Sequence, residues 1–136
     1  MNKLDKLIGI PFKLGGIDFD GCDCRGICYL YHKHVHGVEF PYDDGKRIKF
    51  RNPKNDKKRI NDFLCNFCHH IGFQDLEEGD FVIMKAKKDI GVLGVCVDNK
   101  KILYTTKRYG SCMAKISLLK DIFILGYRPF YYESNN

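Results

Sequence analysis

The sequence predicts an α+β domain in which N-terminal helices pack on a C-terminal antiparallel sheet of five or six strands. Three observations predict this class and its organisation as one domain. Apolar residues recur at helical spacing through the first half of the chain, whereas after Asp75 they alternate in short β-rich runs. The third observation is length, because 136 residues suffice for one hydrophobic core and are too few for two. We therefore expect a single domain over residues 1–136.

Three segments of the first half are predicted to be helical. The first covers residues 3–9, and the second covers about 24–36 and ends at Gly37. The third covers about 56–71 and ends at Gly72. Asp56 can cap this third helix, and one continuous apolar stripe runs along it, formed by Ile60, Phe63, Leu64, Phe67, Cys68 and Ile71.

The second half is predicted to form an antiparallel meander. Asp98-Asn99-Lys100-Lys101 fits a hairpin turn, because Asp and Asn tolerate left-handed backbone conformations. The predicted strands cover about 80–86, 91–98, 101–106, 112–117 and 122–130.

One cysteine stands at the start of the second predicted helix. Asp23-Cys24-Arg25-Gly26 forms a tight turn that runs directly into the apolar helical pattern. A thiol in the first helical turn lies among unpaired backbone N–H groups and at the positive end of the helix dipole, and both favour the thiolate. Cys24 is therefore a candidate nucleophile, and a small buried core residue is the alternative interpretation.

Four short patterns occur in a fixed order along the chain: Ile10–Gly16, Asp23–Gly26, Leu76–Ile83 and Val92–Val95. In this order and spacing they resemble the NlpC/P60 family of papain-like cysteine peptidases, particularly the cell-wall peptidase-like proteins of phage tails and gene transfer agents. The resemblance implies a papain-like fold. It also implies a cysteine peptidase or amidase that cleaves peptidoglycan stem peptides, with Cys24 as the nucleophile.

Three positions depart from the family pattern. The resemblance places Val92 where the family has its general base, Phe12 in place of a tyrosine, and Tyr104 in place of the polar group that orients the base. Valine cannot accept a proton, and the family's Cys–His pair both supplies the thiolate and protonates the leaving amine. The departures predict a pseudoenzyme, retained as a structural or interaction component of a phage tail tip, baseplate or related particle.

An active enzyme is the main alternative. Its base would come from another position, such as His36, His69 or His70. A redox or thiol-modified module that uses Cys22 and Cys24 is a weaker alternative, because cysteines two residues apart at a turn rarely reach disulfide geometry.

Other cysteines and histidines have metal-like spacing. Cys65, Cys68, His69 and His70 form a C-x-x-C-H-H run that Cys22, Cys24 or Cys28 could complete as a zinc site. The run falls within the third predicted helix, whereas structural zinc usually draws such pairs from turns. We therefore predict no metal and no cofactor. The seven cysteines are expected to be reduced thiols.

The formal charge of +6 admits an anionic partner. The densest basic run, Lys46–Arg59, also contains Pro, Asn and Asp, which favours a solvated loop over a nucleic-acid-binding surface. Loop 39–56 is instead the candidate protein interface, because it combines aromatic and basic residues. The expected partners are other protein subunits of a tail or baseplate, with peptidoglycan as a second candidate.

The N-terminus, Met1–Ile8, is amphipathic and reads neither as a signal peptide nor as a membrane span. We therefore expect a protein made in the host cytoplasm and located in the virion tail or baseplate.

Overall fold

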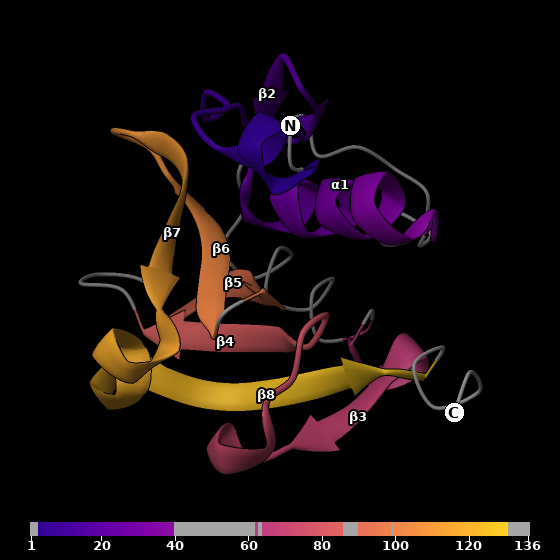
Figure 1. Cartoon of the computed structure of the whole chain (residues 1–136), viewed down its shortest axis with the longest axis vertical. Helices are drawn as coiled ribbons and strands as arrows, with labels where there is room; N and C mark the ends of the chain where they lie inside the picture. Colours follow the sequence, from indigo (N-terminus) through magenta and orange to yellow (C-terminus); the bar gives the residue numbers. More distant parts are fainter. Residues whose placement is uncertain (1–2, 40–61, 63, 86–89, 99, 131–136) are drawn as a thin grey trace.

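One α-helix, α1 (Cys24–His36), lies beside a six-stranded antiparallel sheet in the computed structural model (Figure 1). The structure describes residues 3–39, 62, 64–85, 90–98 and 100–130. The predicted α+β class and the antiparallel sheet are confirmed. Within the described ranges, no helix has the length and apolar character needed to cross a membrane.

The sheet has the strand order β3-β8-β4-β5-β6-β7, and α1 packs on β5 and β6. A separate two-stranded sheet, β1 with β2, precedes the helix. The strands are β1 (Ile17–Asp18), β2 (Gly21–Cys22), β3 (Cys68–Ile71), β4 (Phe81–Lys85), β5 (Ile90–Val97), β6 (Lys101–Thr106), β7 (Gly110–Lys115) and β8 (Phe123–Pro129). Three 3₁₀ segments are also present: η1 (Lys3–Leu7), η2 (Phe73–Asp75) and η3 (Ile116–Ile122).

The bounds predicted for the second helix and for the strand over residues 101–106 are confirmed. Local signals explain the helix. The Asp23 side chain accepts a hydrogen bond from the Gly26 N–H at the start, and Gly37 at the end adopts the left-handed conformation with φ 69°. The predicted first helix is the 3₁₀ segment η1, which is shorter than expected.

The predicted third helix is wrong at its C-terminal end. Residues 64–67 are helical, but Cys68–Ile71 forms β3 and pairs with the Gly126–Pro129 part of β8. The helical stripe is a local preference, and the backbone pairing offered by β8 overrides it. Leu64 is fully buried and Phe67 is half-buried, as members of the core. Ile60 and Phe63 lie outside the described residues.

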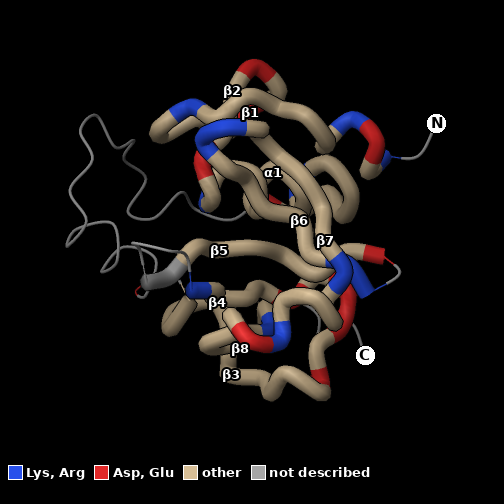
Figure 2. Tube along the Cα trace, turned by 90° about the vertical axis from the view of Figure 1, so that its left-hand side faces the viewer, with Lys and Arg blue, Asp and Glu red and all other residues tan. Residues whose placement is uncertain are grey.

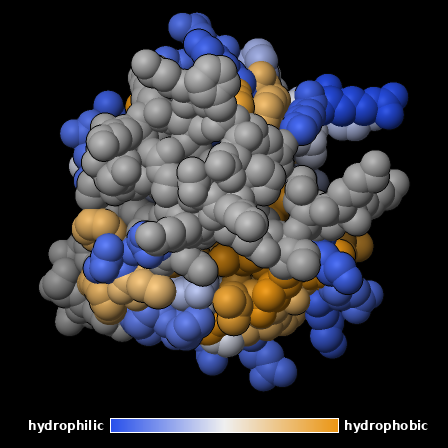
Figure 3. Space-filling view, turned by 180° about the vertical axis from the view of Figure 1, so that it is seen from behind, coloured by the Kyte–Doolittle hydropathy of each residue, from blue (hydrophilic) through white to orange (hydrophobic). Residues whose placement is uncertain are grey.

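Strand alternation divides the apolar interior into two clusters, one on each face of the sheet. The first cluster joins α1 to the sheet, through Ile27, Cys28, Leu30, Tyr31, Phe81, Leu93, Val95, Val97 and Leu103 among others. The second cluster lies on the other face, where Val82, Met84, Cys96 and Ile102 are its buried members. Seen from behind, apolar side chains also reach the surface in the lower part of the molecule (Figure 3).

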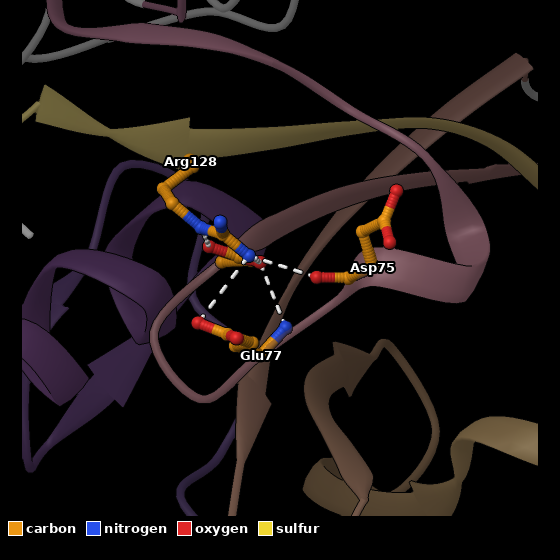
Figure 4. A network of polar contacts seen from close by, with 4 residues as sticks. Asp75, Glu77 and Arg128 are labelled. Carbon is orange, nitrogen blue, oxygen red and sulfur yellow. Dashed lines mark hydrogen bonds and ion pairs between the residues drawn. The ribbon is translucent and has the colours of Figure 1, made fainter. Parts of the chain in front are cut away.

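A polar network joins β8 to the turn before β4, which covers residues 75–80 (Figure 4). The Asp80 carboxylate, which is buried, accepts hydrogen bonds from Arg128 Nε at 3.0 Å, from Arg128 Nη2 at 2.9 Å and from the Glu77 N–H at 2.8 Å. Arg128 Nη2 also donates to the Asp75 carbonyl at 2.8 Å. The Arg128 side chain therefore holds the whole turn against β8.

The same turn also contacts the C-terminal half of α1. The Glu78 carboxylate accepts a hydrogen bond from the Tyr31 hydroxyl and lies 2.7 Å from His36 Nε2. The His32 ring is fully buried, with its centroid 5.0 Å from that of Phe81. Residues 77–81 thus connect the helix, β4 and β8, and they hold α1 at a defined position over the sheet.

Candidate functional site

Cys24 is the first residue of α1 and is half-buried. The loop before the helix is bound to its first turn by Asp23. One carboxylate oxygen of Asp23 accepts from the Gly26 N–H at 2.8 Å, and the other accepts from the Gly15 N–H at 2.8 Å. The Asp23 N–H in turn donates to the Gly16 carbonyl at 3.3 Å. These bonds hold the Cys24 thiol at the positive end of the helix dipole, as the sequence predicted.

The structure explains why the Asp-Cys-x-Gly turn ends in a glycine, Gly26. A Cβ atom at Gly26 would lie 1.8 Å from the Gly16 carbonyl oxygen, which is a backbone atom and cannot rotate away. The loop thus packs directly on the helix backbone.

We expect Gly26→Ala to destabilise the domain by about 1–3 kcal/mol or more, because the loop must move away from the helix. Gly72→Ala is the matched control, since a Cβ there meets only the Asp75 carboxylate at 3.6 Å. Urea unfolding of both variants measures the difference. Equal free energies of unfolding for the two variants would contradict the close contact.

Two further cysteines near the start of α1 are poor nucleophiles. Burial, followed by the charges of Asp23 and Asp18, raises the pKa of the Cys22 thiol to about 12, and this thiol donates to the Asp18 carbonyl at 3.0 Å. Burial also raises the pKa of the Cys28 thiol well above its usual range. Cys24 is the only one of the three that is not fully buried, so it is the thiol best placed to react.

Arg25 and Phe12 lie beside this thiol-bearing turn. The Arg25 side chain is buried, and its Nη2 atom lies 3.9 Å from the Asp23 carboxylate. Phe12 is half-buried and forms a parallel bridge with Cys22. A buried arginine beside the nucleophile position was not expected from the sequence, because a single charged residue in a helical pattern normally indicates the solvent-facing side.

At the position of the family's base, Val92 was expected to face the Cys24 sulfur, and this expectation is wrong. Val92 packs against the second cluster, together with Tyr104, whereas Cys24 packs against the first. Alternation is the reason: Leu93 and Val95 point toward α1, so Val92 points to the other face of β5. The structure therefore brings Val92 and Tyr104 together on one face of the sheet and places Cys24 on the other.

The five histidines of the chain are all described, and they lie in two places. His32, His34 and His36 follow Cys24 on α1, at about 12–18 Å along the helix axis from its 1.5 Å rise per residue. His69 and His70 lie on β3, which is three strands from β5 in the sheet order, or about 14 Å at the usual strand spacing. The main sheet contacts of α1 are with β5 and β6, and not with β3.

The C-x-x-C-H-H run has a different structure from the one expected. Cys65 is exposed, whereas Cys68 is buried at the start of β3. In the described part of the chain, no three His, Cys, Asp or Glu side chains are grouped to hold a metal ion.

Two polar residues on β6 and β7, Thr105 and Ser111, are buried, and the sequence patterns did not identify them. The buried Ser111 hydroxyl accepts from the Ile10 N–H at 2.8 Å and donates to the Leu7 carbonyl. Its cross-strand neighbour Thr105 is buried, with a hydroxyl that has no partner among the described residues. Polar residues at inward positions of predicted strands are the signal that could have identified them.

A cysteine at the head of a helix that packs on an antiparallel sheet defines the class of papain-like cysteine hydrolase folds. Residues 9–118 match the model of the NlpC/P60 family, so the chain belongs to that family, whose members are cysteine peptidases and amidases acting on peptidoglycan. The resemblance expected from the four motifs is thereby confirmed.

Solved structures share the fold at low sequence identity. The P60 domain of antigen MAP1204 from M. avium subspecies paratuberculosis is 16% identical, with 93% of this chain and 90% of that chain covered and a TM-score of 0.58. The NlpC/P60 domain of the peptidoglycan hydrolase SagA is 14% identical, with 91% of each chain covered and a TM-score of 0.57. A family protein from Bacillus cereus is 15% identical, with 96% and 40% covered and a TM-score of 0.61.

A curated relative of a different description also matches. The dual specificity protein phosphatase YVH1 of Plasmodium falciparum is 29% identical over 85 residues, which cover 60% of this chain. The match spans only 15% of the length of that relative.

Proposed function

We propose that this chain is an NlpC/P60 domain that does not hydrolyse peptidoglycan and acts as an interaction module of a protein assembly. The observation that carries the proposal is that the motif residue aligned with the family's histidine is Val92, which cannot accept a proton and whose side chain lies on the sheet face away from Cys24. A thiol with its ordinary pKa near 8.5 is only a few per cent ionised at neutral pH, and amide cleavage also needs an acid for the leaving amine.

The position of the histidines supports this proposal. A substitute base must reach the sulfur directly or through one water. The helical rise places the His32, His34 and His36 backbones about 12–18 Å along the axis from Cys24, and His69 and His70 lie on β3 at the far edge of the sheet from β6 and β7, which supports the proposal. The simplest reason for retaining an inactive domain is that it binds other proteins. A phage tail tip or baseplate is the assembly we propose, with the protein made in the host cytoplasm.

An active peptidase or amidase is the second candidate. The half-buried Cys24 at the helix N-terminus favours it, because this position promotes the thiolate. In that case Cys24 attacks the peptide carbonyl carbon, and a group other than the aligned Val92 accepts the thiol proton.

Purified protein is expected to release no stem-peptide fragments from peptidoglycan above a Cys24→Ala control. Loss of one member of a catalytic unit typically costs several orders of magnitude in rate. Chromatography of the soluble fragments measures the release, and the SagA domain serves as the positive control. Turnover that disappears in Cys24→Ala would overturn the proposal, and His36→Gln, His69→Gln and His70→Gln would then test the three candidate bases.

A further inference from the structure

The β6–β7 hairpin and the first five residues of η3 carry an unusual distribution of charge, with Asp98 and Asp121 as the nearest acidic residues on either side. Residues 100–120 contain six of the 23 basic residues and none of the 17 acidic residues, and no other stretch without an acidic residue is as long. The tube coloured by charge shows basic residues beside the end of β7, with acidic segments next to them (Figure 2). The hairpin therefore presents a positive field to any partner.

Two lysines of this hairpin lie directly opposite each other. Lys101 on β6 is the cross-strand partner of Lys115 on β7, so the two side chains share one face of the sheet. Neither lysine forms a salt bridge with another of the described residues. Like charges at directly opposed positions destabilise a strand pair, and an acidic group from outside the chain would relieve the repulsion.

Among the described residues, none pairs with the outer edge of β7 beside these lysines. β7 is the last strand in the sheet order, and residues 9–10 cover its edge only at Ser111, through the Gly9 N–H and the Ile10 carbonyl. By antiparallel alternation, Met113 and Lys115 also point their backbone N–H and C=O groups outward. These groups have no partner within the described ranges, and the nearby Leu118 side chain is 74% exposed.

We propose that the β7 edge at Met113–Lys115 binds an extended acidic peptide segment of a partner protein by strand addition. The outward backbone groups pair with the peptide backbone, the lysines pair with its carboxylates, and Leu118 contacts an apolar side chain. An open strand edge selects a polypeptide over a nucleic acid, because only a polypeptide can continue the ladder. This inference rests on the proposed function and names the partner class of the module.

Lys115 offers a substitution that tests the backbone contact separately from the charge. Its φ is −65°, which is the value that proline imposes, and its N–H points outward. Lys115→Pro and Lys115→Ala both remove the charge, but only Lys115→Pro also removes the N–H. The two variants therefore differ in strand addition alone.

The probe is a fluorescein-labelled eight-residue peptide of alternating Glu and Val, and fluorescence anisotropy measures its binding to the full chain. We expect Lys101→Glu with Lys115→Glu to weaken binding at least tenfold. The matched control, Lys33→Glu with Lys85→Glu, changes the net charge equally and is expected to weaken binding less than twofold. Lys115→Pro is expected to bind at least fivefold more weakly than Lys115→Ala.

Three results would overturn the inference: an equal loss in the matched control, equal binding by Lys115→Pro and Lys115→Ala, or tighter binding of duplex DNA or polyphosphate than of the peptide. A second measurement uses Lys115→Glu, which places opposite charges across the strands. This variant should melt at a higher temperature than the natural chain and yet bind the peptide more weakly. Peptide binding and fragment release are separate readouts, so a failure of the inference can be told apart from a failure of the proposed function.

Discussion

Arg128→Ala is expected to destabilise the domain by about 3–5 kcal/mol, because it leaves the buried Asp80 carboxylate without its charged partner. The side chain of Asp80 is only 1% exposed, and Arg128 supplies two of the three hydrogen bonds that described residues donate to it. Burial raises the pKa of the Asp80 carboxyl, and the hydrogen bonds from Arg128 and Glu77 oppose that rise. Chemical denaturation at pH 7 measures the loss.

Two controls separate this pair from a general effect of removing arginine. Arg108→Ala removes an exposed arginine from the β6–β7 turn and is expected to change stability by less than about 0.5 kcal/mol. Asp80→Ala combined with Arg128→Ala removes both charges. We expect the double variant to lose less free energy of unfolding than the two single variants lose in sum. Additive losses would mean that the two side chains stabilise the turn independently.

The domain is expected to lose stability as the pH falls from about 6.5 toward 3, because His32 is buried in its neutral form. Burial, followed by the charge of His36, lowers the pKa of His32 from 6.5 to about 3, while a hydrogen bond to Gly79 opposes the shift. The unfolded chain therefore binds a proton below pH 6.5 that the folded chain does not. The stability is complete above pH 6.5 and falls by up to about 1.4 kcal/mol per pH unit below it.

The groups facing His32 define the test. His36 lies 6.1 Å away between ring centroids, Tyr31 lies 5.3 Å away, and Glu78 bonds to both of these neighbours. His32→Gln is expected to flatten the decline between pH 6.5 and 5, above the usual range of carboxylates, whereas His70→Gln, at an exposed position, should retain it. Urea unfolding across this range measures both slopes, and equal slopes would show that His32 is not the group responsible.

The elements that were predicted correctly depend on short-range signals. The start of α1 at Cys24 and its end at Gly37 follow from a capping aspartate and a left-handed glycine, which act over three or four residues. The β6 strand follows from alternation within six residues. The family motifs are equally local, so the family and the fold class could be recognised in the chain without any knowledge of its contacts.

The remaining features depend on partners far away in the chain. Cys68–Ile71 is a strand because β8, more than 50 residues later, pairs with it, and Asp80 is buried because Arg128 lies 48 residues away and neutralises it. The face occupied by Val92 follows from its register with β4 and from the side of the sheet that α1 covers. Each of these long-range pairings competes with other possible contacts. Their relative free energies depend on the whole fold, so the local sequence does not determine which pairing forms.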